Sequence, residues 1–270
     1  ASLSAYFANV KDGHVEAGLR TGNLFSPWPE EGNRKLTGVL TNYHFAPTKL
    51  SQENLINEGV DTKHIYITGN TVIDSLIMAQ NLINEETSLN KKFNKLFSFL
   101  DSSKKLILVT GHRRESFGEG FENICKALQS IAKNDDLEIL YPVHLNPNVQ
   151  GPVYEILSDT HNIHLIEPLM YQEFVFLLKH SYMILTDSGG IQEEAPSLGK
   201  PVVVMRDITE RPEAVKAGTV VLSGNNKDAI IKEVTSLIKD NDKYLKMSKS
   251  YNPYGNGDAC TKIVDILKMI

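Results

Sequence analysis

The sequence predicts an α/β protein whose strands form parallel sheets. From residue 104 onward, short segments rich in Val, Ile and Leu alternate with segments of helical periodicity. Regular alternation of this kind is typical of a doubly wound sheet with helices on both faces. One strand also runs directly into a Ser-Gly-Gly turn at 188–190, which exposes backbone N–H groups where a helix begins. The alternation defines the fold class, and the Ser-Gly-Gly turn indicates an anion site.

The second part of the chain has enough elements for a complete sheet. Strands are predicted at 105–110, 138–143, 163–166, 182–186, 201–205 and 219–222. Helices are predicted to follow them at 119–133, 149–158, 171–180, 190–198, 210–217 and 226–239. These strands and helices together make a complete doubly wound parallel sheet.

The first hundred residues repeat the pattern in a shorter form. Strands are predicted at 13–16, 43–46 and 64–68, and helices at 33–42, 48–59 and 70–83. A polar stretch at 84–103, with one short predicted helix, separates the two parts. Because a parallel sheet needs several strands and cover on both faces, we expect the first domain to be incomplete in this chain.

Composition and charge exclude several classes of function. The chain has 270 residues, of which 41% are hydrophobic and 23% charged, enough for one large or two medium domains. A formal net charge of -5 and a pI near 5.9 give no general attraction for nucleic acid or anionic membranes. The apolar runs are far shorter than the ~20 residues of a membrane span. We therefore expect no nucleic-acid partner and no membrane partner.

The two cysteines indicate neither metal nor disulfide chemistry. Cys125 and Cys260 lie in predicted helices and belong to no CxxC or His/Cys cluster. The sequence therefore predicts no metal site, and a reducing, cytoplasmic location fits this cysteine usage.

The segment from Asp187 to Glu194 carries the most specific local pattern. Backbone N–H groups of Ser188, Gly189 and Gly190 at a helix N-terminus can hold a phosphate. Glu194 follows in the same helix, where its carboxylate can accept hydrogen bonds from ribose hydroxyls. Phosphate and ribose together indicate a nucleotide. The alternative is a tight strand-to-helix turn without a ligand.

Polar side chains follow several predicted strands at their carboxyl ends, where ligands of open α/β sheets bind. Glu16 ends the strand at 13–16, His112 and Arg113 follow the strand at 105–110, and His144 follows the strand at 138–143. Loops chosen for solubility alone would favour Lys, Asp and Ser over repeated His and Arg. The loops therefore predict one shared active cleft.

Longer stretches occur in a specific order: HVEAGLRTG at 14–22, SPWPEEGNR at 26–34, TGHRRESFG at 110–118, YPVHLNPNV at 141–149 and LTDSGGIQEEAPSLGKPVVVMRDITERPEAV at 185–215. With NPYGNGDA at 252–259, they resemble the bacterial non-hydrolysing UDP-N-acetylglucosamine 2-epimerases over nearly the whole chain. The family's opening segment, with a Gly-Thr-Arg-Pro-Glu type motif and a Gly-Asp-Thr motif, has no counterpart here.

The resemblance implies two Rossmann-like domains that face each other across a cleft, a GT-B-like arrangement with the first domain incomplete. The expected regions are the remaining N-terminal Rossmann-like part (1–68), connecting helices or a linker (69–103), the UDP-binding Rossmann-like domain (104–248) and a C-terminal helix crossing back to the first domain (249–270). It also implies a homodimer and a role in polysaccharide biosynthesis.

The implied reaction interconverts UDP-N-acetylglucosamine and UDP-N-acetylmannosamine by elimination of UDP to 2-acetamidoglucal and re-addition, with no cofactor. Glu16 and Glu30 match two acid/base carboxylates of the family, and His112 matches its essential histidine. Glu30 could instead be a helix N-terminal charge before 33–42, and His112 a structural donor in its turn. The third carboxylate belongs to the absent Gly-Asp-Thr motif and has no assignment.

The resemblance also implies substrate contacts. Ser188, Gly189 and Gly190 are expected to hold the diphosphate, Glu194 the ribose, and Arg211 another part of the substrate. Arg211 could alternatively pair with a neighbouring Glu on its helix face.

The uracil is expected near Leu169 and Phe174, although Phe174 also suits the core of helix 171–180. Relatives carry a polar residue at the position of Leu169, so only backbone contacts to the base would persist there. Arg113 and His144 are the candidates for contacting a second UDP-N-acetylglucosamine molecule, the family's allosteric activator.

Alternative functions remain open at this point. A glycosyltransferase of the same architecture, a hydrolysing epimerase that releases free N-acetylmannosamine, and an inactive UDP-binding fragment all fit the pattern. We expect residues 1–270 alone to bind UDP weakly and to turn over negligibly.

Overall fold

The computed structural model describes residues 1–270, and its contacts divide the chain into two compact units. Unit 1 contains residues 1–77, 209–213 and 253–270, and unit 2 contains residues 78–208 and 214–252. The backbone thus passes from one unit to the other after residues 77, 208, 213 and 252. Each unit has its own parallel sheet.

Unit 2 is built on a six-stranded sheet with the strand order of a Rossmann fold. Its strands are β4 (Lys105–Thr110), β5 (Leu137–Pro142), β6 (Ile163–Ile166), β7 (Met183–Thr186), β8 (Val202–Val204) and β9 (Val220–Leu222). They lie in the order β6-β5-β4-β7-β8-β9 and are all parallel, so the chain order reverses between β4 and β7. Ligands of such sheets bind beyond the carboxyl ends of the strands at this switch point.

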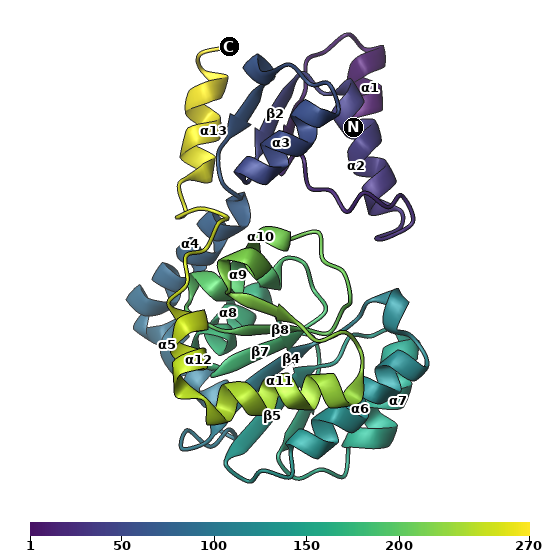
Figure 1. Cartoon of the computed structure of the whole chain (residues 1–270). Coiled ribbons are helices and arrows are strands. Elements are labelled where there is room, and N and C mark those ends of the chain that lie inside the picture. The colour runs from purple at the N-terminus through teal and green to yellow at the C-terminus, as the bar shows by residue number, and fades with distance from the viewer. The chain divides into compact units, whose positions relative to one another are not determined.

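Helices cover both faces of the unit 2 sheet (Figure 1). They are α5 (Thr87–Leu96), α6 (Glu119–Ile131), α7 (Pro147–Leu157), α8 (Tyr171–His180), α9 (Ile191–Ser197), α11 (Lys227–Lys239) and α12 (Asn241–Ser248), with η2 (Arg114–Ser116) before α6. Ile107 and Val109 of β4 belong to the core formed with α6, α7 and α11. Leu106 and Leu108 are also buried, on the opposite face of the same strand. Burial on both faces explains why these strands are continuous apolar runs.

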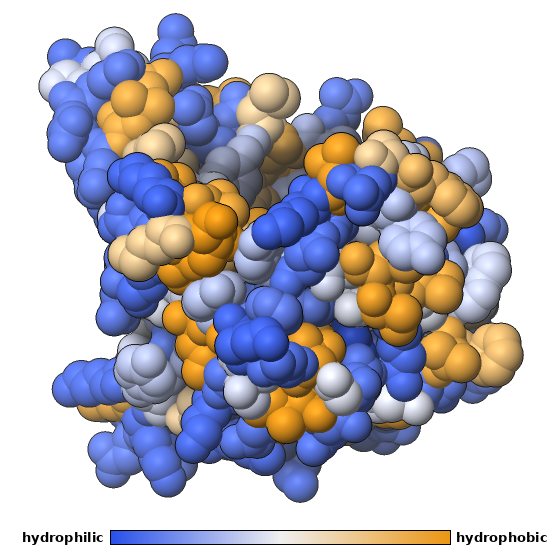
Figure 2. Space-filling view, turned by 90° about the horizontal axis from the view of Figure 1, so that it is seen from above, coloured by the Kyte–Doolittle hydropathy of each residue, from blue (hydrophilic) through white to orange (hydrophobic).

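Unit 1 is built on a smaller, three-stranded parallel sheet in the order β1-β2-β3. Its elements are α1 (Ser2–Phe7), β1 (Gly13–Val15), α2 (Glu30–Leu40), β2 (Tyr43–Ala46), α3 (Lys49–Asn57), η1 (Thr62–His64), β3 (Ile65–Ile67) and α13 (Ala259–Leu267). The core between this sheet and α3 contains Ala17, Ala46, Leu55 and Ile65. Large apolar side chains of α1 and α2 remain exposed, and Figure 2 shows apolar groups scattered between hydrophilic ones on the face drawn there.

Two helices lie where the chain changes unit: α4 (Thr71–Glu85) and α10 (Pro212–Ala217). The C-terminal segment joins unit 1 through hydrogen bonds to the start of α4. Backbone N–H groups of Ala259 and Cys260 donate to the Asp74 carboxylate at 3.2 and 2.9 Å. Gly69 has a φ of +85°, and a Cβ there would lie 3.1 Å from the Tyr254 carbonyl oxygen, so this close approach requires glycine.

The predicted α/β fold class is confirmed, and every predicted strand is present within one residue of its expected ends. Helix α2 begins at Glu30 rather than 33, because the acidic residues after Pro29 suit a helix N-terminus. Helices α1 and α12 were not predicted, since α1 buries no residue and α12 buries only Met247, which leaves little periodic signal. The predicted linker 69–103 is divided between the units after residue 77. None of the helices has both the length and the apolar composition needed to cross a bilayer.

Candidate active site

The switch point of unit 2 joins two of the predicted site loops. Asp187 follows β7 and is fully buried. Its Oδ2 accepts hydrogen bonds from the backbone N–H groups of His112 and Arg113, both at 2.8 Å. The loop after β4 is therefore tied to the loop after β7, beside Ser188. The fold thus brings together a histidine and a Ser-Gly-Gly turn that lie more than seventy positions apart.

The His112 imidazole lies between a carboxylate and a second imidazole. Its Nδ1 is 3.5 Å from Oδ1 of Asp187, and its ring stacks on His144 with centroids 5.5 Å apart at 23°. Burial is the main cause that lowers the pKa of His112, the neighbouring Asp187 opposes it, and Arg113, His144 and Arg206 lower it further. His112 is therefore a neutral imidazole near pH 7.

His144 is itself held in place by its loop. Its Nδ1 accepts a hydrogen bond of 3.1 Å from the backbone N–H of Asn146, so a neutral ring carries its proton on Nε2. The two allosteric candidates, Arg113 and His144, therefore both lie beside His112.

The Ser-Gly-Gly turn presents backbone donors at the start of α9. The N–H of Ser188 donates to the Thr186 hydroxyl at 2.9 Å, whereas those of Gly189 and Gly190 make no hydrogen bond within the chain. Gly190 has an ordinary helical φ of -62°. A Cβ on Gly190 would meet nothing closer than Oε2 of Glu194, at 3.8 Å. Neither the backbone nor the packing therefore demands glycine at this position.

Glu194 is buried beside this turn. Its Oε1 accepts a hydrogen bond of 2.7 Å from the Tyr171 hydroxyl. Burial raises the pKa of Glu194, and the hydrogen bond from Tyr171 opposes that shift. Leu169 and Phe174, which flank Tyr171, are half-buried, whereas the next four residues of α8, 175–178, are all buried.

In unit 1, Glu16 lies at the end of β1 within a network of charged side chains. It has a φ of +67°, a sparsely populated region for a residue with a Cβ. Its Oε1 accepts hydrogen bonds from Asn70 at 2.9 Å and from Arg211 at 3.3 Å. Arg211 also pairs with Glu210 at 2.7 Å, as the alternative interpretation expected. Arg211 therefore contacts both carboxylates.

A second guanidinium lies close to that of Arg211. Arg34, one turn after Glu30 on α2, has its Nη2 4.0 Å from Oε1 of Glu210, and its buried Nη1 makes no hydrogen bond. Burial lowers the pKa of Arg34, and the positive charge of Arg211 lowers it further. Two cations therefore converge beside the carboxylates of Glu16 and Glu210.

The adjacent carboxylates of α2 have different environments. Glu31 is fully buried and accepts hydrogen bonds from the backbone N–H groups of Thr21 and Gly22, both at 3.1 Å. Glu31 therefore holds the loop before α2. Glu30 is half-buried and is the first residue of α2, the position that the helix N-terminal interpretation expected.

Four residues of these sites were not singled out in the sequence: Asp187, Tyr171, Asn70 and Arg34. Asp187 precedes Ser188 directly, and Arg34 lies four positions after Glu30 on one helix face, so both had a local signal. Tyr171 and Asn70 act through contacts 23 and 54 positions away, which no local pattern reveals.

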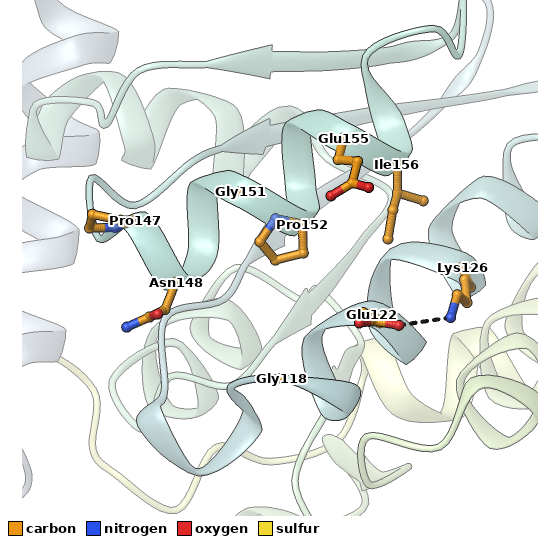
Figure 3. A pocket seen from close by; sticks show the side chains of 9 residues that line it. All are labelled: Gly118, Glu122, Lys126, Pro147, Asn148, Gly151, Pro152, Glu155 and Ile156. Carbon is orange, nitrogen blue, oxygen red and sulfur yellow. Dashed lines mark hydrogen bonds and ion pairs between the residues drawn. The ribbon is translucent and has the colours of Figure 1, made fainter.

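One cavity of unit 2 is lined by none of these residues. It has a volume of about 500 Å³ and lies between α6 and α7, and the ion pair of Glu122 and Lys126, both on α6, forms part of its lining (Figure 3). A cavity of about 410 Å³ in unit 1 is lined by residues that include Arg20, Glu31 and Glu58. No group of three or more His, Cys, Asp or Glu side chains is arranged to hold a metal ion.

The Rossmann strand order and the loops gathered at its switch point define an α/β protein of the GT-B-like class. Residues 1–268 match the profile of the UDP-N-acetylglucosamine 2-epimerases. The chain belongs to this family of enzymes.

Relatives and solved structures agree with this assignment. The UDP-N-acetylglucosamine 2-epimerase of Escherichia coli K12 is 57% identical over 268 residues, which are 99% of this chain and 71% of the relative. The crystal structure of the Neisseria meningitidis enzyme bound to UDP-GlcNAc superposes with a TM-score of 0.98 at 50% identity, covering 100% of this chain and 73% of that one. A Staphylococcus aureus MnaA–UDP structure gives a TM-score of 0.90 at 45% identity, covering 99% and 71%.

Proposed function

We propose that the protein interconverts UDP-N-acetylglucosamine and UDP-N-acetylmannosamine. Family membership supports the reaction, and the Neisseria meningitidis relative was solved with UDP-GlcNAc bound. The observation that carries the proposal for this chain is the switch point of unit 2, where Asp187 ties the loop of His112 to the Ser188 turn. An imidazole beside backbone donors suits the cleavage of a bond between a sugar and a diphosphate.

The proposed route is elimination followed by re-addition. C2 of the sugar has no adjacent carbonyl, so its proton is too weakly acidic for direct removal and return. In the elimination, a base takes the C2 proton while the C1–O bond breaks, giving 2-acetamidoglucal and UDP. Re-addition of UDP with protonation of the other face of C2 gives the epimer. The route involves no net oxidation, so no redox cofactor is expected.

The diphosphate is proposed to bind Ser188, Gly189 and Gly190. The N–H groups of both glycines are available, and the space beside Gly190 is free of protein atoms other than Glu194. Because neither backbone strain nor packing explains Gly190, a bound anion is the remaining reason for a residue without a side chain there. This argument favours the anion site over a structural turn.

The ribose is proposed to bind Glu194. Tyr171 holds Oε1 of this carboxylate, and Oε2 faces the Gly190 turn, from which it can accept a hydroxyl. The uracil is proposed to lie against Leu169 and Phe174, because both are half-buried at the start of the helix that carries Tyr171.

Glu16 and Glu30 are proposed as the acid/base carboxylates of unit 1. Asn70 and Arg211 hold Glu16 by two hydrogen bonds while its side chain keeps 42% of its surface exposed, so it can meet a substrate. Arg211 is proposed to contact the substrate, and the nearby Arg34 adds a second positive charge to the same part of unit 1.

His112 is proposed as the catalytic group of unit 2. Its side chain is 40% exposed, and its lowered pKa leaves a neutral imidazole that can receive a proton during turnover. Arg113 and His144 are proposed to contact a second UDP-N-acetylglucosamine, which acts as activator. Both residues lie beside His112, so a ligand bound to them can change the position of its ring. The homodimer and the cytoplasmic location remain predictions.

Product analysis by NMR tests the proposed function. Incubation with UDP-N-acetylglucosamine in ²H₂O is expected to give UDP-N-acetylmannosamine with deuterium at C2, because the proton removed there exchanges with solvent. Free N-acetylmannosamine would instead indicate a hydrolysing epimerase, and sugar transferred to an acceptor a glycosyltransferase. Saturable UDP binding without any product would leave only the UDP-binding alternative.

A further inference from the structure

Asp187 is a buried carboxylate to which the reaction itself assigns no role. Its Oδ2 accepts two backbone hydrogen bonds of 2.8 Å, from His112 and Arg113. A carboxylate without water is unfavourable unless such donors replace its hydration. The two N–H groups therefore account for one oxygen and fix the path of the loop that carries His112.

The other oxygen of Asp187 faces the His112 ring. Oδ1 is buried, makes no hydrogen bond and lies 3.5 Å from Nδ1 of His112. A lone pair on Nδ1 would face a second acceptor, whereas a proton on Nδ1 would be attracted by the carboxylate charge 3.5 Å away. The geometry therefore selects the tautomer with its proton on Nδ1 and a lone pair on Nε2.

His144 restricts the same ring from a second direction. The two imidazoles stack at 5.5 Å and 23°, and the loop contact of His144 to Asn146 keeps its own ring in place. The His112 ring thus has a carboxylate at one edge and an aromatic ring on one face. Little freedom to turn remains.

We propose that Asp187 is the positioning residue of His112. Through Oδ2 it holds the loop, and through Oδ1 it holds the proton on Nδ1, so that Nε2 is presented as the proton acceptor. The catalytic consequence rests on the proposed function of His112. The position of the proton, however, is a property of the free protein and is measurable without substrate.

The variant Asp187→Asn tests this role directly. The asparagine keeps the side-chain volume and one oxygen that can accept the backbone N–H groups of His112 and Arg113. Its amide NH₂ group then faces Nδ1 of His112 as a donor, which favours the tautomer with the proton on Nε2. We expect kcat to fall about 10²-fold or more with KM and UDP affinity within about threefold. ¹⁵N NMR should show the His112 proton on Nδ1 in the wild type and on Nε2 in the variant. The acid limb of kcat should also move to lower pH, because the carboxylate that raises the pKa of His112 is lost.

A matched control is available in the same unit. Asp135 and His161 form another aspartate–histidine pair at 3.5 Å, but their side chains are 84% and 74% exposed. Asp135→Asn is therefore expected to change neither turnover nor the His112 tautomer.

Several outcomes would overturn the proposal. Wild-type kcat in Asp187→Asn would do so, and so would a wild-type His112 with its proton on Nε2, a result that needs no variant to fold. Loss of UDP affinity and thermal stability with an unchanged tautomer would show a purely structural role. Because residues 1–270 alone are expected to turn over negligibly, a wild-type complete polypeptide that does not epimerise would refute the proposed function. The tautomer comparison needs no turnover and would then decide the positioning role alone.

Discussion

The two units hold their site residues by different means. In unit 2, backbone N–H groups fix the loop of His112 to the fully buried Asp187, at the end of strands buried on both faces. In unit 1, the side chains of Asn70 and Arg211 hold the Glu16 carboxylate, and the Glu16 side chain is 42% exposed. Exposed charge contacts are screened by salt and contribute little to stability, whereas buried backbone contacts persist. The fold thus positions His112, while a balance of charges positions Glu16.

The largest expected effect belongs to the residue that the fold positions. His112→Ala should lower kcat by about 10³-fold, about 4 kcal/mol in activation free energy, because the proton acceptor is lost. UDP affinity by calorimetry should stay within about threefold, since the diphosphate contacts are proposed at the Ser188 turn. His161→Ala, an exposed histidine of the same unit, is the control and should retain full activity. Retained turnover in His112→Ala would remove this residue from the mechanism.

A smaller effect is expected in the unit 1 network. Glu16→Gln still accepts a hydrogen bond from Asn70 but loses the charge that faces Arg211. We expect kcat to fall about 10²-fold, with the melting temperature nearly unchanged because partly exposed pairs contribute little stability. The matched control is Glu53→Gln on the exposed face of α3. A kcat within about fivefold of wild type would show that Glu16 only balances the positive charge of Arg211 and takes no part in proton transfer.

The smallest effect concerns the acid stability of unit 1. Burial is the main cause that lowers the pKa of His14 to about 4. Between the ordinary pKa of about 6.5 and this value, the unfolded chain binds a proton that the folded chain does not. The full difference between these pKa values corresponds to about 3.4 kcal/mol. Because His14 is partly exposed, solvent screening reduces the loss expected for unit 1 to about 2 kcal/mol as the pH falls through that window.

Hydrogen exchange measures this loss separately in each unit. Amides of β1 and β2 should lose protection below pH 6 before those of β4 and β7 do, and His14→Gln should flatten the dependence. Equal acid sensitivity of both sheets would contradict the proposed difference between the units.

The sequence predicted the site best where a residue's role depends on its place at a strand end or a helix start. Strands buried on both faces form apolar runs, and His112, Ser188 and Glu194 lie at strand ends or helix starts, so these features could be predicted. Glu30 and Glu31 could not be told apart from their sequence. Only the fold shows that Glu31 is occupied by two backbone N–H groups.

Contacts between distant positions escaped prediction. Arg211 meets Glu16 across 195 positions, and Tyr171 meets Glu194 across 23. Such pairs depend on how the chain returns to each unit, which periodicity does not encode. Residues 209–213 are an example: they belong to unit 1, although the residues before and after them in the chain belong to unit 2.

Because residues 253–270 belong to unit 1, they determine the order in which the two units can be completed during synthesis. Every residue of unit 2 has been polymerised before residue 253 is added. The bonds from Ala259 and Cys260 to Asp74 can form only afterwards. Domains of growing chains usually complete in order from the N-terminus. Here unit 1 still lacks residues 253–270 when the last residue of unit 2 has been added, and until then the Asp74 carboxylate lacks these two backbone donors.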